Sequence, residues 1–236
     1  ELTGGDAQVL LTTHSPYFIN VEHFDGIKVC RNHAGATTVS SSTFSAVVHN
    51  YNGAFNKPLS NENQAKTKLA IQTQPKFNEI FFADRVVLVE GISDFACLEA
   101  FLRLSGRRAD FRKAGAAIVV CDAKSSLALT LLVLKSFDIQ YHAIFDCDAD
   151  CDERHSQEHI RDNNAIFALA GHSKLENFPQ DNVFHDNLTA WRFNIEAILD
   201  EEYGDEKEVC KEAGRDAAGQ LKRANKQPLY VAAAME

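Results

Sequence analysis

Hydrophobic and polar positions are arranged irregularly in the first third of the chain. Two apolar stretches, residues 7–20 and 26–32, predict strands, and Pro16 turns the end of the first one into a polar turn. Residues 33–78 are rich in Ser, Thr, Asn and Gly, with weak periodicity, so we expect a connector with a short helix around residues 62–71. A long irregular passage of this kind is typical of a boundary between domains.

Three continuous apolar runs follow this connector. They cover residues 84–91, 115–124 and 141–150, and each ends in Gly or in polar residues. Short uninterrupted apolar runs are typical of strands that are buried on both faces. We therefore expect three central strands here.

Segments with helical periodicity separate and follow these strands. Residues 93–106 predict a helix with Ser93 as N-cap and Gly106 as its stop, and residues 126–139 predict a second amphipathic helix. Residues 155–170 predict a further helix and a fourth strand. Alternation of strands and helices of these lengths indicates an α/β fold with a parallel sheet.

The C-terminal region has a different pattern. Residues 187–202 and 208–225 predict helices, and the mixed charges of residues 200–212 are typical of a solvated helix face. The stretch AILDEE, residues 197–202, looks like the end of a Walker B strand, but we interpret it as helix surface because of its charged helical context.

Composition limits the class of protein. The chain has 236 residues, of which 45% are hydrophobic, so it is long and apolar enough to form a packed core. No apolar run reaches the roughly 18 residues that span a bilayer, and the first residues, ELTGGDAQ, do not have the pattern of a signal peptide. We expect a soluble cytoplasmic protein without a membrane partner.

Charge and cysteine content narrow the chemistry further. The formal net charge of −9 argues against a broad basic surface that binds nucleic acid by bulk electrostatics, although cations can reverse the local sign at a carboxylate site. The six cysteines include no CxxC pair, and Cys147 and Cys151 have no second ligand pair nearby. We therefore expect reduced thiols rather than disulfides or a zinc site.

The densest group of charges follows the third apolar run. The sequence FDCDADCDERH, residues 145–155, contains five carboxylates, of which Asp146 and Asp148 come first. Glu90 ends the first of the three strands, and Asp94 follows one helical turn later. Because the carboxyl ends of parallel strands meet at one edge of a sheet, we expect these four side chains to lie together. Hard oxygen ligands of this kind suit Mg²⁺ or Mn²⁺.

Other interpretations of the acidic stretch fit less well. A calcium loop requires Gly at the position of Cys151 and Glu at the position of Gln157. A haloacid-dehalogenase-type phosphatase has its DxD motif near the start of the domain, and Asp150 replaces the usual Thr or Val. A capped helix followed by a solvated acidic loop, without any catalytic role, stays open.

The combined motifs VLVEGISD and FDCD resemble a Toprim domain, the fold shared by topoisomerases, primases and certain nucleases. Glu90 matches the family's Glu after the first strand, and Asp146 and Asp148 match its DxD. Asp94 matches the additional acid of the nuclease branch. The resemblance implies a metal-dependent site that acts on phosphodiester bonds.

The flanking sequences resemble one branch of that family. VLLTTHSPYFIN, residues 9–20, resembles the end of an ABC-type ATPase head, in which His14 corresponds to the switch histidine. KFNEIFFADRVVLVEG, residues 76–91, resembles the join between ATPase and Toprim parts in the overcoming-lysogenisation-defect (OLD) family of ATP-dependent nucleases. No GxxxxGK[ST] motif is present, so we expect ATP to act only in a full-length protein.

The resemblance implies two further functional residues, and position along the chain suggests a third. Glu176, in HSKLENF, matches a downstream acidic motif and is an expected additional metal ligand. Lys226, in KQPLYVA, resembles a C-terminal lysine that stabilises charge on the scissile phosphate. Lys124 precedes a predicted helix, and we expect it to contact DNA phosphate. Asp150 and Asp152 lie farther from the strand end, so we expect them to face solvent or to support the ligands.

These observations predict an α/β protein with a Toprim-type parallel sheet flanked by helices and a helical C-terminal appendage. The expected divisions are an ABC-type ATPase remnant at 1–35, a connector at 36–79, the Toprim nuclease domain at 80–187 and the appendage at 188–236. The expected function is a DNA endonuclease or nickase that uses one or two Mg²⁺ or Mn²⁺ ions, and the family resemblance implies phage defence as its biological setting. The expected partners are DNA, the protein's own ATPase domain and a second copy bound through that domain. A topoisomerase or primase, or a Toprim scaffold without catalysis, is the alternative.

Overall fold

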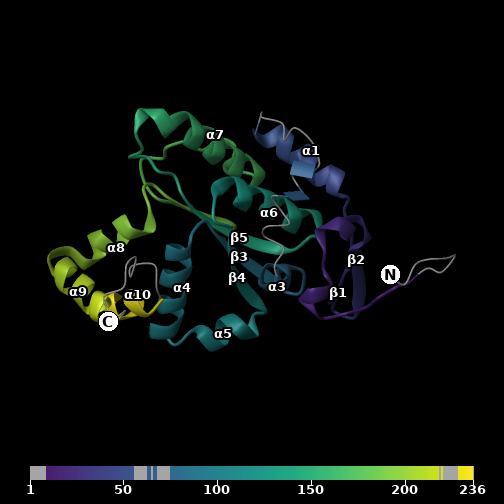
Figure 1. Ribbon diagram of the computed structural model, residues 1–236, viewed down its shortest axis with the longest axis horizontal. Coiled ribbons are helices and arrows are strands. Elements are labelled where there is room, and N and C mark those ends of the chain that lie inside the picture. Colours follow the sequence, from purple (N-terminus) through teal and green to yellow (C-terminus); the bar gives the residue numbers. More distant parts are fainter. Residues whose placement is uncertain are drawn as a thin grey trace.

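The computed structural model describes residues 9–55, 63–64, 66–67, 75–217, 219 and 228–235. A mostly parallel sheet lies at the centre, with helices on both of its faces (Figure 1). None of the helices in these ranges is both long and apolar enough to cross a membrane.

The first described residues do not form the expected strand. Residues 9–13 have no regular structure and are followed by the 3-10 helices Pro16–Phe18 and Val21–Gly26. Leu10 is 88% exposed, because this apolar segment pairs with no other strand within the described part of the chain. The second predicted strand, at residues 26–32, overlaps β1 (Val29–His33) and is confirmed in part.

The expected connector is largely ordered structure. β1 pairs antiparallel with β2 (Ala36–Ser40), and α1 (Phe44–Phe55) packs against two helices of the central sheet, α6 and α7. Its residues Phe44, Val47 and Tyr51 are buried in the main core. The prediction of irregular chain was therefore wrong for β2 and α1, although the helix expected at 62–71 lies mostly outside the described residues.

The central sheet has five strands in the order β4-β3-β5-β7-β6. Four of them run parallel, and β6 pairs antiparallel with β7 at one end of the sheet. The three predicted apolar strands are confirmed as β3, β4 and β5. The strand bounds are β3 Arg85–Val89, β4 Ala116–Val120, β5 Gln140–Asp146, β6 Val183–His185 and β7 Leu188–Trp191.

Two expectations about the later elements were wrong. Residues 155–170 contain no strand, because α7 (Glu153–Leu169) is one continuous helix with Asp152 as its N-cap. The fourth parallel strand is β7, within residues 187–202, where the sequence predicted a helix. The sheet therefore continues past residue 187, the predicted end of the Toprim domain.

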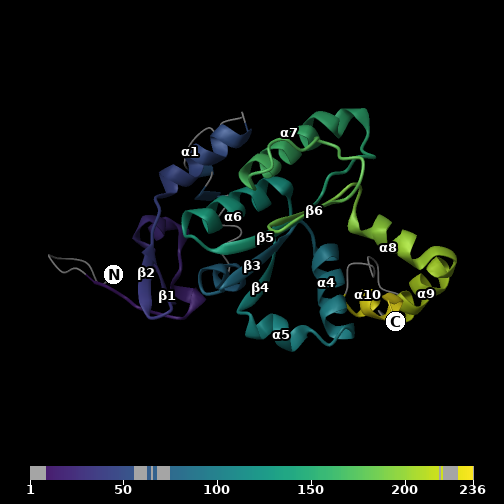
Figure 2. The same cartoon turned by 180° about the vertical axis from the view of Figure 1, so that it is seen from behind.

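Helices cover both faces of the sheet, as Figures 1 and 2 show from opposite sides. α4 (Ile92–Leu104) and α5 (Arg108–Lys113) lie on one face, and α6 (Lys124–Ser136) and α7 lie with α1 on the other. α4 begins one residue before Ser93, and its N-cap is Gly91, so Ser93 is not the cap. The predicted stop is confirmed, because Gly106 follows the helix with φ +68°.

Aromatic side chains join these layers into one main core. The ring of Phe137 contacts Phe24 and Phe81 edge to face at centroid distances of 5.4 and 5.3 Å, so the segments before the sheet are packed onto it. Such pairs add about 0.5–1.5 kcal/mol to the free energy gained by burying their area. The short helices here are α3 (Pro75–Asn78) and the 3-10 turn Glu79–Phe81.

A second, smaller core holds the C-terminal helices against α4. Val231 and Ala232 of α10 (Pro228–Met235) pack on Ala96 and Ala100 of α4. The predicted C-terminal helices are confirmed in part as α8 (Ile195–Tyr203) and α9 (Lys207–Ala217), joined by the 3-10 turn Gly204–Glu206. The C-terminal end thus supports the helix that carries Asp94.

Candidate active site

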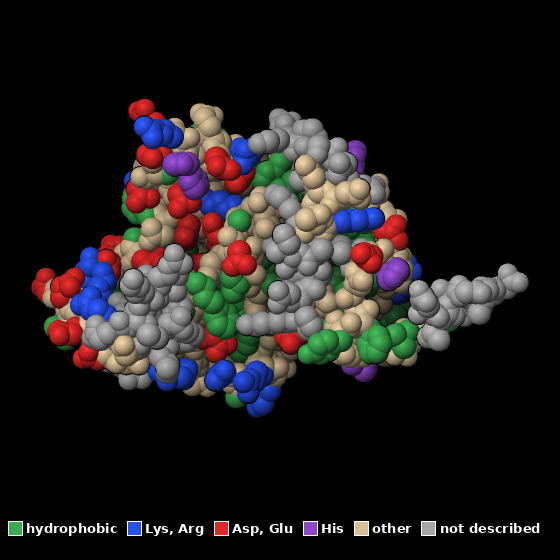
Figure 3. Space-filling model, in the orientation of Figure 1, with side chains coloured by type: hydrophobic (Ala, Val, Ile, Leu, Met, Phe, Trp, Pro, Cys, Tyr) green, Lys and Arg blue, Asp and Glu red, His purple; other side chains and the backbone are tan. Residues whose placement is uncertain are grey.

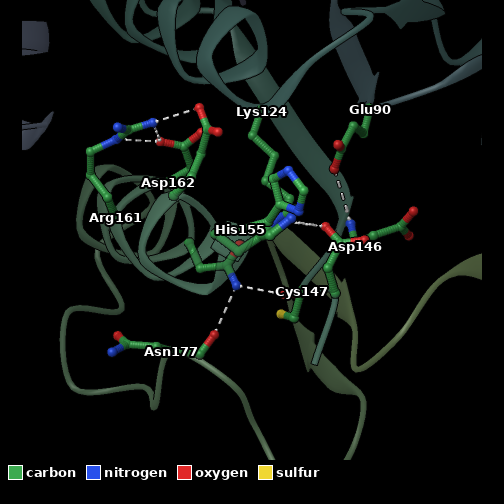
Figure 4. A network of polar contacts seen from close by, with 12 residues as sticks. Glu90, Lys124, Asp146, Cys147, His155, Arg161, Asp162 and Asn177 are labelled. Atoms are coloured by element: carbon green, nitrogen blue, oxygen red, sulfur yellow. Dashed lines mark hydrogen bonds and ion pairs between the residues drawn. The ribbon is translucent and has the colours of Figure 1, made fainter. Parts of the chain in front are cut away.

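Glu90 and Asp146 lie side by side at one edge of the sheet. β3 and β5 are parallel neighbours, with Val89 paired to Ile144, so the residues that follow these two positions emerge together. The Asp146 backbone N–H donates to Glu90 Oε2 at 3.2 Å, and the Glu90 N–H donates to the carbonyl of Ile144 at 3.1 Å (Figure 4). The sheet itself therefore holds these two predicted carboxylates in place.

Asp94 reaches the same edge from the first turn of α4. Its Oδ2 accepts a hydrogen bond from the Gly91 N–H at 2.9 Å, and the residue is only 4% exposed. A carboxylate in the first turn of a helix is stabilised by the positive end of the helix dipole. This interaction fixes Asp94 beside the end of β3.

Asp148 lies beyond the strand end in a left-handed conformation, with φ +52°. Its Oδ2 lies 2.5 Å from Lys124 Nζ and 2.9 Å from His159 Nδ1, and Lys124 Nζ is also 3.1 Å from that nitrogen. Lys124 is 4% exposed at the start of α6. The lysine expected to contact DNA phosphate is thus paired with Asp148 in this structure.

The loop that carries Asp148 is tied to a neighbouring loop by Asn163. This fully buried side chain donates from Nδ2 to the carbonyl of Cys147 at 2.9 Å and to the carbonyl of Asn177 at 2.8 Å (Figure 4). Glu176, the residue before Asn177, is exposed. The backbone beside Glu176, but not its side chain, is therefore joined to the loop after β5.

Burial and mutual repulsion disfavour the charged forms of the two central carboxylates. Burial is the main cause that raises the pKa of Asp146 to about 9, and the charges of Asp94 and Glu90 raise it further. Burial also raises the pKa of Glu90 to about 7, although the positive charge of Lys124 partly offsets this effect. Glu196, in the first turn of α8, also acts on Asp146. A cation bound at this edge would favour the charged forms of these carboxylates.

The donor set fits a hard divalent ion, such as Mg²⁺ or Mn²⁺, by its chemistry. Asp146 Oδ1 is buried and has no hydrogen-bond partner within the described part of the chain. A buried oxygen of this kind is costly unless a hydrogen bond or a cation satisfies it. In this conformation, however, the described residues contain no group of three or more His, Cys, Asp or Glu side chains arranged to hold a metal ion. Binding would require the carboxylates to turn toward one another.

Two further predicted functional residues are His14 and Lys226. His14 is exposed in the irregular N-terminal segment and lines an open cavity of about 1680 Å³, to which none of the four carboxylates contributes. Lys226 lies outside the described residues. The six cysteines are free thiols, as expected.

His159 and Asn163 are site residues that the sequence analysis missed. Both lie on α7, which begins soon after the acidic stretch, and His155 and His159 stand one helical turn apart. That spacing places both histidines on one helix face close to the DxD motif, and it could have drawn attention to them. Asn163 gave no such signal, because its role depends on the packing of α7 over the loop.

Comparison with known proteins agrees with the geometry of this edge. Residues 81–148 match the family model described as the overcoming lysogenization defect protein-like TOPRIM domain. An OLD nuclease from Thermus scotoductus is 29% identical over 153 residues, which cover 64% of this chain and 27% of that protein. The match thus spans about a quarter of the length of this curated relative. Glu90, Asp94, Asp146 and Asp148 all lie within the matched family region. We conclude that residues 81–148 lie in a Toprim domain similar to that of the OLD-like family.

Proposed function

We propose that this chain is the DNA-cleaving part of a nuclease and that it hydrolyses phosphodiester bonds with the help of a divalent cation. The observation that carries the proposal is the pairing of Glu90 with Asp146 at adjacent strand ends, with Asp94 and Asp148 beside them. This arrangement lies in a domain of a nuclease-containing family, and the relative is named as a nuclease.

The proposed ligands of the ion are Glu90, Asp94, Asp146 and Asp148, with Glu176 as an additional carboxylate. A Mg²⁺ or Mn²⁺ ion held by these residues would lower the pKa of a coordinated water and neutralise negative charge on a phosphodiester, and a second ion would stabilise the leaving oxygen. The raised pKa values of Glu90 and Asp146 support the proposal, because such values mark a site where negative charge is concentrated in a buried setting.

The protein's own groups prepare this edge for DNA. The Asp146 N–H orients the Glu90 carboxylate, and Lys124 with His159 orients Asp148. We further propose that Lys226 stabilises negative charge on the phosphate that is cut, since a lysine is a compact point charge suited to that task.

The wider setting of this activity consists of predictions from the family resemblance. They are an ATPase domain of the same protein that contributes His14, a homodimer formed through that domain, a cytoplasmic location and a role in phage defence.

Plasmid nicking tests the proposal. The 236-residue chain is expected to convert supercoiled DNA to the open circle in Mn²⁺ or Mg²⁺ and not in EDTA. Glu90→Ala should lower the rate at least about a hundredfold, because one essential carboxylate is lost from the cation site. Glu202→Ala, an exposed carboxylate on α8, is the matched control and should cleave like the wild type.

Two results would count against this function. A Glu90→Ala protein that still nicks DNA at the wild-type rate would contradict the assignment of Glu90 to the cation site. A covalent protein–DNA adduct in place of a free 5′-phosphate end would indicate a topoisomerase-type reaction rather than hydrolysis.

A further inference from the structure

Positive charge is concentrated on one small part of this acidic chain. Five of its 24 Lys and Arg residues lie within residues 103–113, together with the single acid Asp110. They extend from the last turn of α4 to the end of α5, and all five are exposed. We call them the α4–α5 basic surface: Arg103, Arg107, Arg108, Arg112 and Lys113. Figure 3 shows blue side chains at the bottom of the view, where Figure 1 places α5.

Helix stability accounts for only part of this cluster. Arg112 and Lys113 lie in the last turn of α5, where a positive charge interacts favourably with the helix dipole. Arg107 and Arg108 occupy the N-cap and first position of the same helix, where a positive charge is unfavourable. A role outside the helix explains these two arginines better.

Ion pairs within the described part of the protein neutralise little of the positive charge on the α4–α5 basic surface. Arg108 lies 3.3 Å from Glu99, but its side chain is half exposed, and an ion pair of this kind contributes at most about 1 kcal/mol. Arg107, Arg112 and Lys113 take part in no ion pair with the described residues. The surface therefore keeps most of its positive charge toward solvent, in a protein with a net charge of −9.

The basic surface is joined to the candidate active site by one rigid element. Asp94 lies in the first turn of α4 and Arg103 in its last, nine residues later. At a rise of about 1.5 Å per residue this is about 14 Å along the helix axis, which is the length of about four base pairs of duplex DNA. The basic surface thus lies about four base pairs from Asp94, measured along the axis of α4.

We propose that the α4–α5 basic surface binds the phosphate backbone of duplex DNA to one side of the cleavage point. The inference rests on the proposed nuclease function, which supplies DNA as the partner, and adds a second point of contact to it. Arginine and lysine side chains neutralise phosphates without reading the base sequence, so this contact contributes affinity and orientation rather than sequence preference.

DNA binding by fluorescence anisotropy tests the proposal in EDTA, where the carboxylate site cannot hold a metal ion. The probe is a labelled short duplex titrated with the 236-residue chain between about 50 and 200 mM salt. The double variant Arg107→Glu/Arg112→Glu should bind at least about tenfold more weakly, and its slope of log K against log salt should be shallower by about 1.8, since each lost phosphate contact removes about 0.9.

The matched control changes the net charge by the same amount elsewhere. Lys28 and Arg215 are exposed and lie outside both the site and the basic surface, so Lys28→Glu/Arg215→Glu should keep most of the wild-type affinity and slope. Equal losses in both double variants, no loss in either, or no binding by the wild type would overturn the proposal. The proposal would also be overturned if Arg107→Glu/Arg112→Glu bound DNA like the wild type but no longer bound anionic lipid vesicles that the wild type binds. A membrane would then be the partner of this surface.

Cleavage separates this inference from the proposed function. One informative result is that Arg107→Glu/Arg112→Glu binds DNA more weakly while no form of the protein cleaves DNA. This result would support DNA binding by the α4–α5 basic surface and contradict the proposed nuclease function. Normal cleavage and unchanged binding by the same variant would count against the surface alone.

Discussion

Lys124 places a buried positive charge among the carboxylates of the site. Its Nζ contacts both Asp148 Oδ2 and His159 Nδ1, and this charge acts to lower the pKa of Glu90. A lysine in this position stabilises the metal-free protein. It also occupies an oxygen that a divalent ion would use, so it should weaken metal binding.

We expect Lys124→Met to bind Mn²⁺ about tenfold more tightly than the wild type, because Asp148 loses its internal cation and a charged hydrogen bond worth about 1.5 kcal/mol. The metal-free variant should be less stable, since Asp148 is left without this partner. Isothermal titration with Mn²⁺ measures the first effect. Lys135→Met, which removes an exposed lysine of the same helix, is the control and should not change the Mn²⁺ affinity. Weaker Mn²⁺ binding by Lys124→Met would contradict this role.

The raised pKa of Asp146 predicts how the stability of the metal-free protein depends on pH. The folded protein keeps this proton up to about pH 9, whereas unfolded Asp releases it near its ordinary value of 3.8. The folded state therefore binds more protons between these values, and the free energy of unfolding falls as the pH rises through them.

Asp146→Asn should remove this contribution. Its stability relative to the wild type should rise by at least about 1 kcal/mol between pH 5 and pH 8, from a dependence of about 1.4 kcal/mol per pH unit for a fully shifted group. Urea unfolding in EDTA at the two pH values measures the difference, with Glu202→Gln as an exposed control. A difference between variant and wild type that is the same at both pH values would show that Asp146 does not hold the proton.

The residues nearest to the strand ends could be predicted from the sequence. Apolar runs that end in Glu90 and Asp146 predict strand ends, and parallel strands bring their carboxyl ends together. The structure places the Glu90 carboxylate within hydrogen-bond distance of the Asp146 backbone N–H, as this rule requires. The ion pair of Lys124 with Asp148 and its contact with His159 could not be predicted, because they depend on how α6 and α7 pack over the loop.

At the scale of single elements, the turn between α5 and β4 depends on Gly115. This residue has φ +62°, a conformation that costs about 1–2 kcal/mol for other residues, and a Cβ added here would overlap the side chain of Asp84. The carbonyl of Gly115 also accepts a hydrogen bond from the Asp84 N–H at 2.9 Å. The turn therefore fixes the start of two central strands.

Gly115→Ala should lower the free energy of unfolding by about 1–3 kcal/mol, through backbone strain and displacement of Asp84. Gly53→Ala is the opposite case, since Gly53 lies in α1 with open space around it and should raise stability by about 0.5–1 kcal/mol. Thermal unfolding of both variants measures the effects. A stable Gly115→Ala protein would show that the turn tolerates a side chain.

Elements with strong patterns were predicted and weak ones were missed. β3 and β5 are uninterrupted apolar strands, which explains their correct prediction. α1 contains Val47, Val48 and Gly53, which are poor helix formers, so burial against α6 and α7 decides its structure. β7 has only four residues, too few for its periodicity to be recognised.

At the scale of the whole molecule, the net charge conceals a separation of charges. The value of −9 argues against a broad basic surface, and the α4–α5 basic surface is a local exception to it. Acidic side chains gather around the carboxylate edge and on α8 with the 3-10 turn that follows it, whereas the basic residues of α4 and α5 lie at another edge (Figure 3). Composition gives the sum of the charges but not their positions.

The C-terminal helices complete the setting of the site. α10 packs on α4, and Glu196 of α8 adds negative charge that acts on Asp146. The C-terminal region, which was expected to be an appendage, therefore supports the helix that carries Asp94. It also contributes to the electrostatic potential at the carboxylate site. This contribution depends on tertiary contacts, so the sequence did not indicate it.

The central claim is that Glu90, Asp94, Asp146 and Asp148 together form a cation site. A crystal soaked in Mn²⁺ tests it most directly, by anomalous scattering from the metal. The predicted result is an anomalous peak about 2.0–2.3 Å from a carboxylate oxygen of both Glu90 and Asp146, with Asp94 or Asp148 as a further ligand. An anomalous map with no peak at this edge, or with peaks only elsewhere on the protein, would contradict the account.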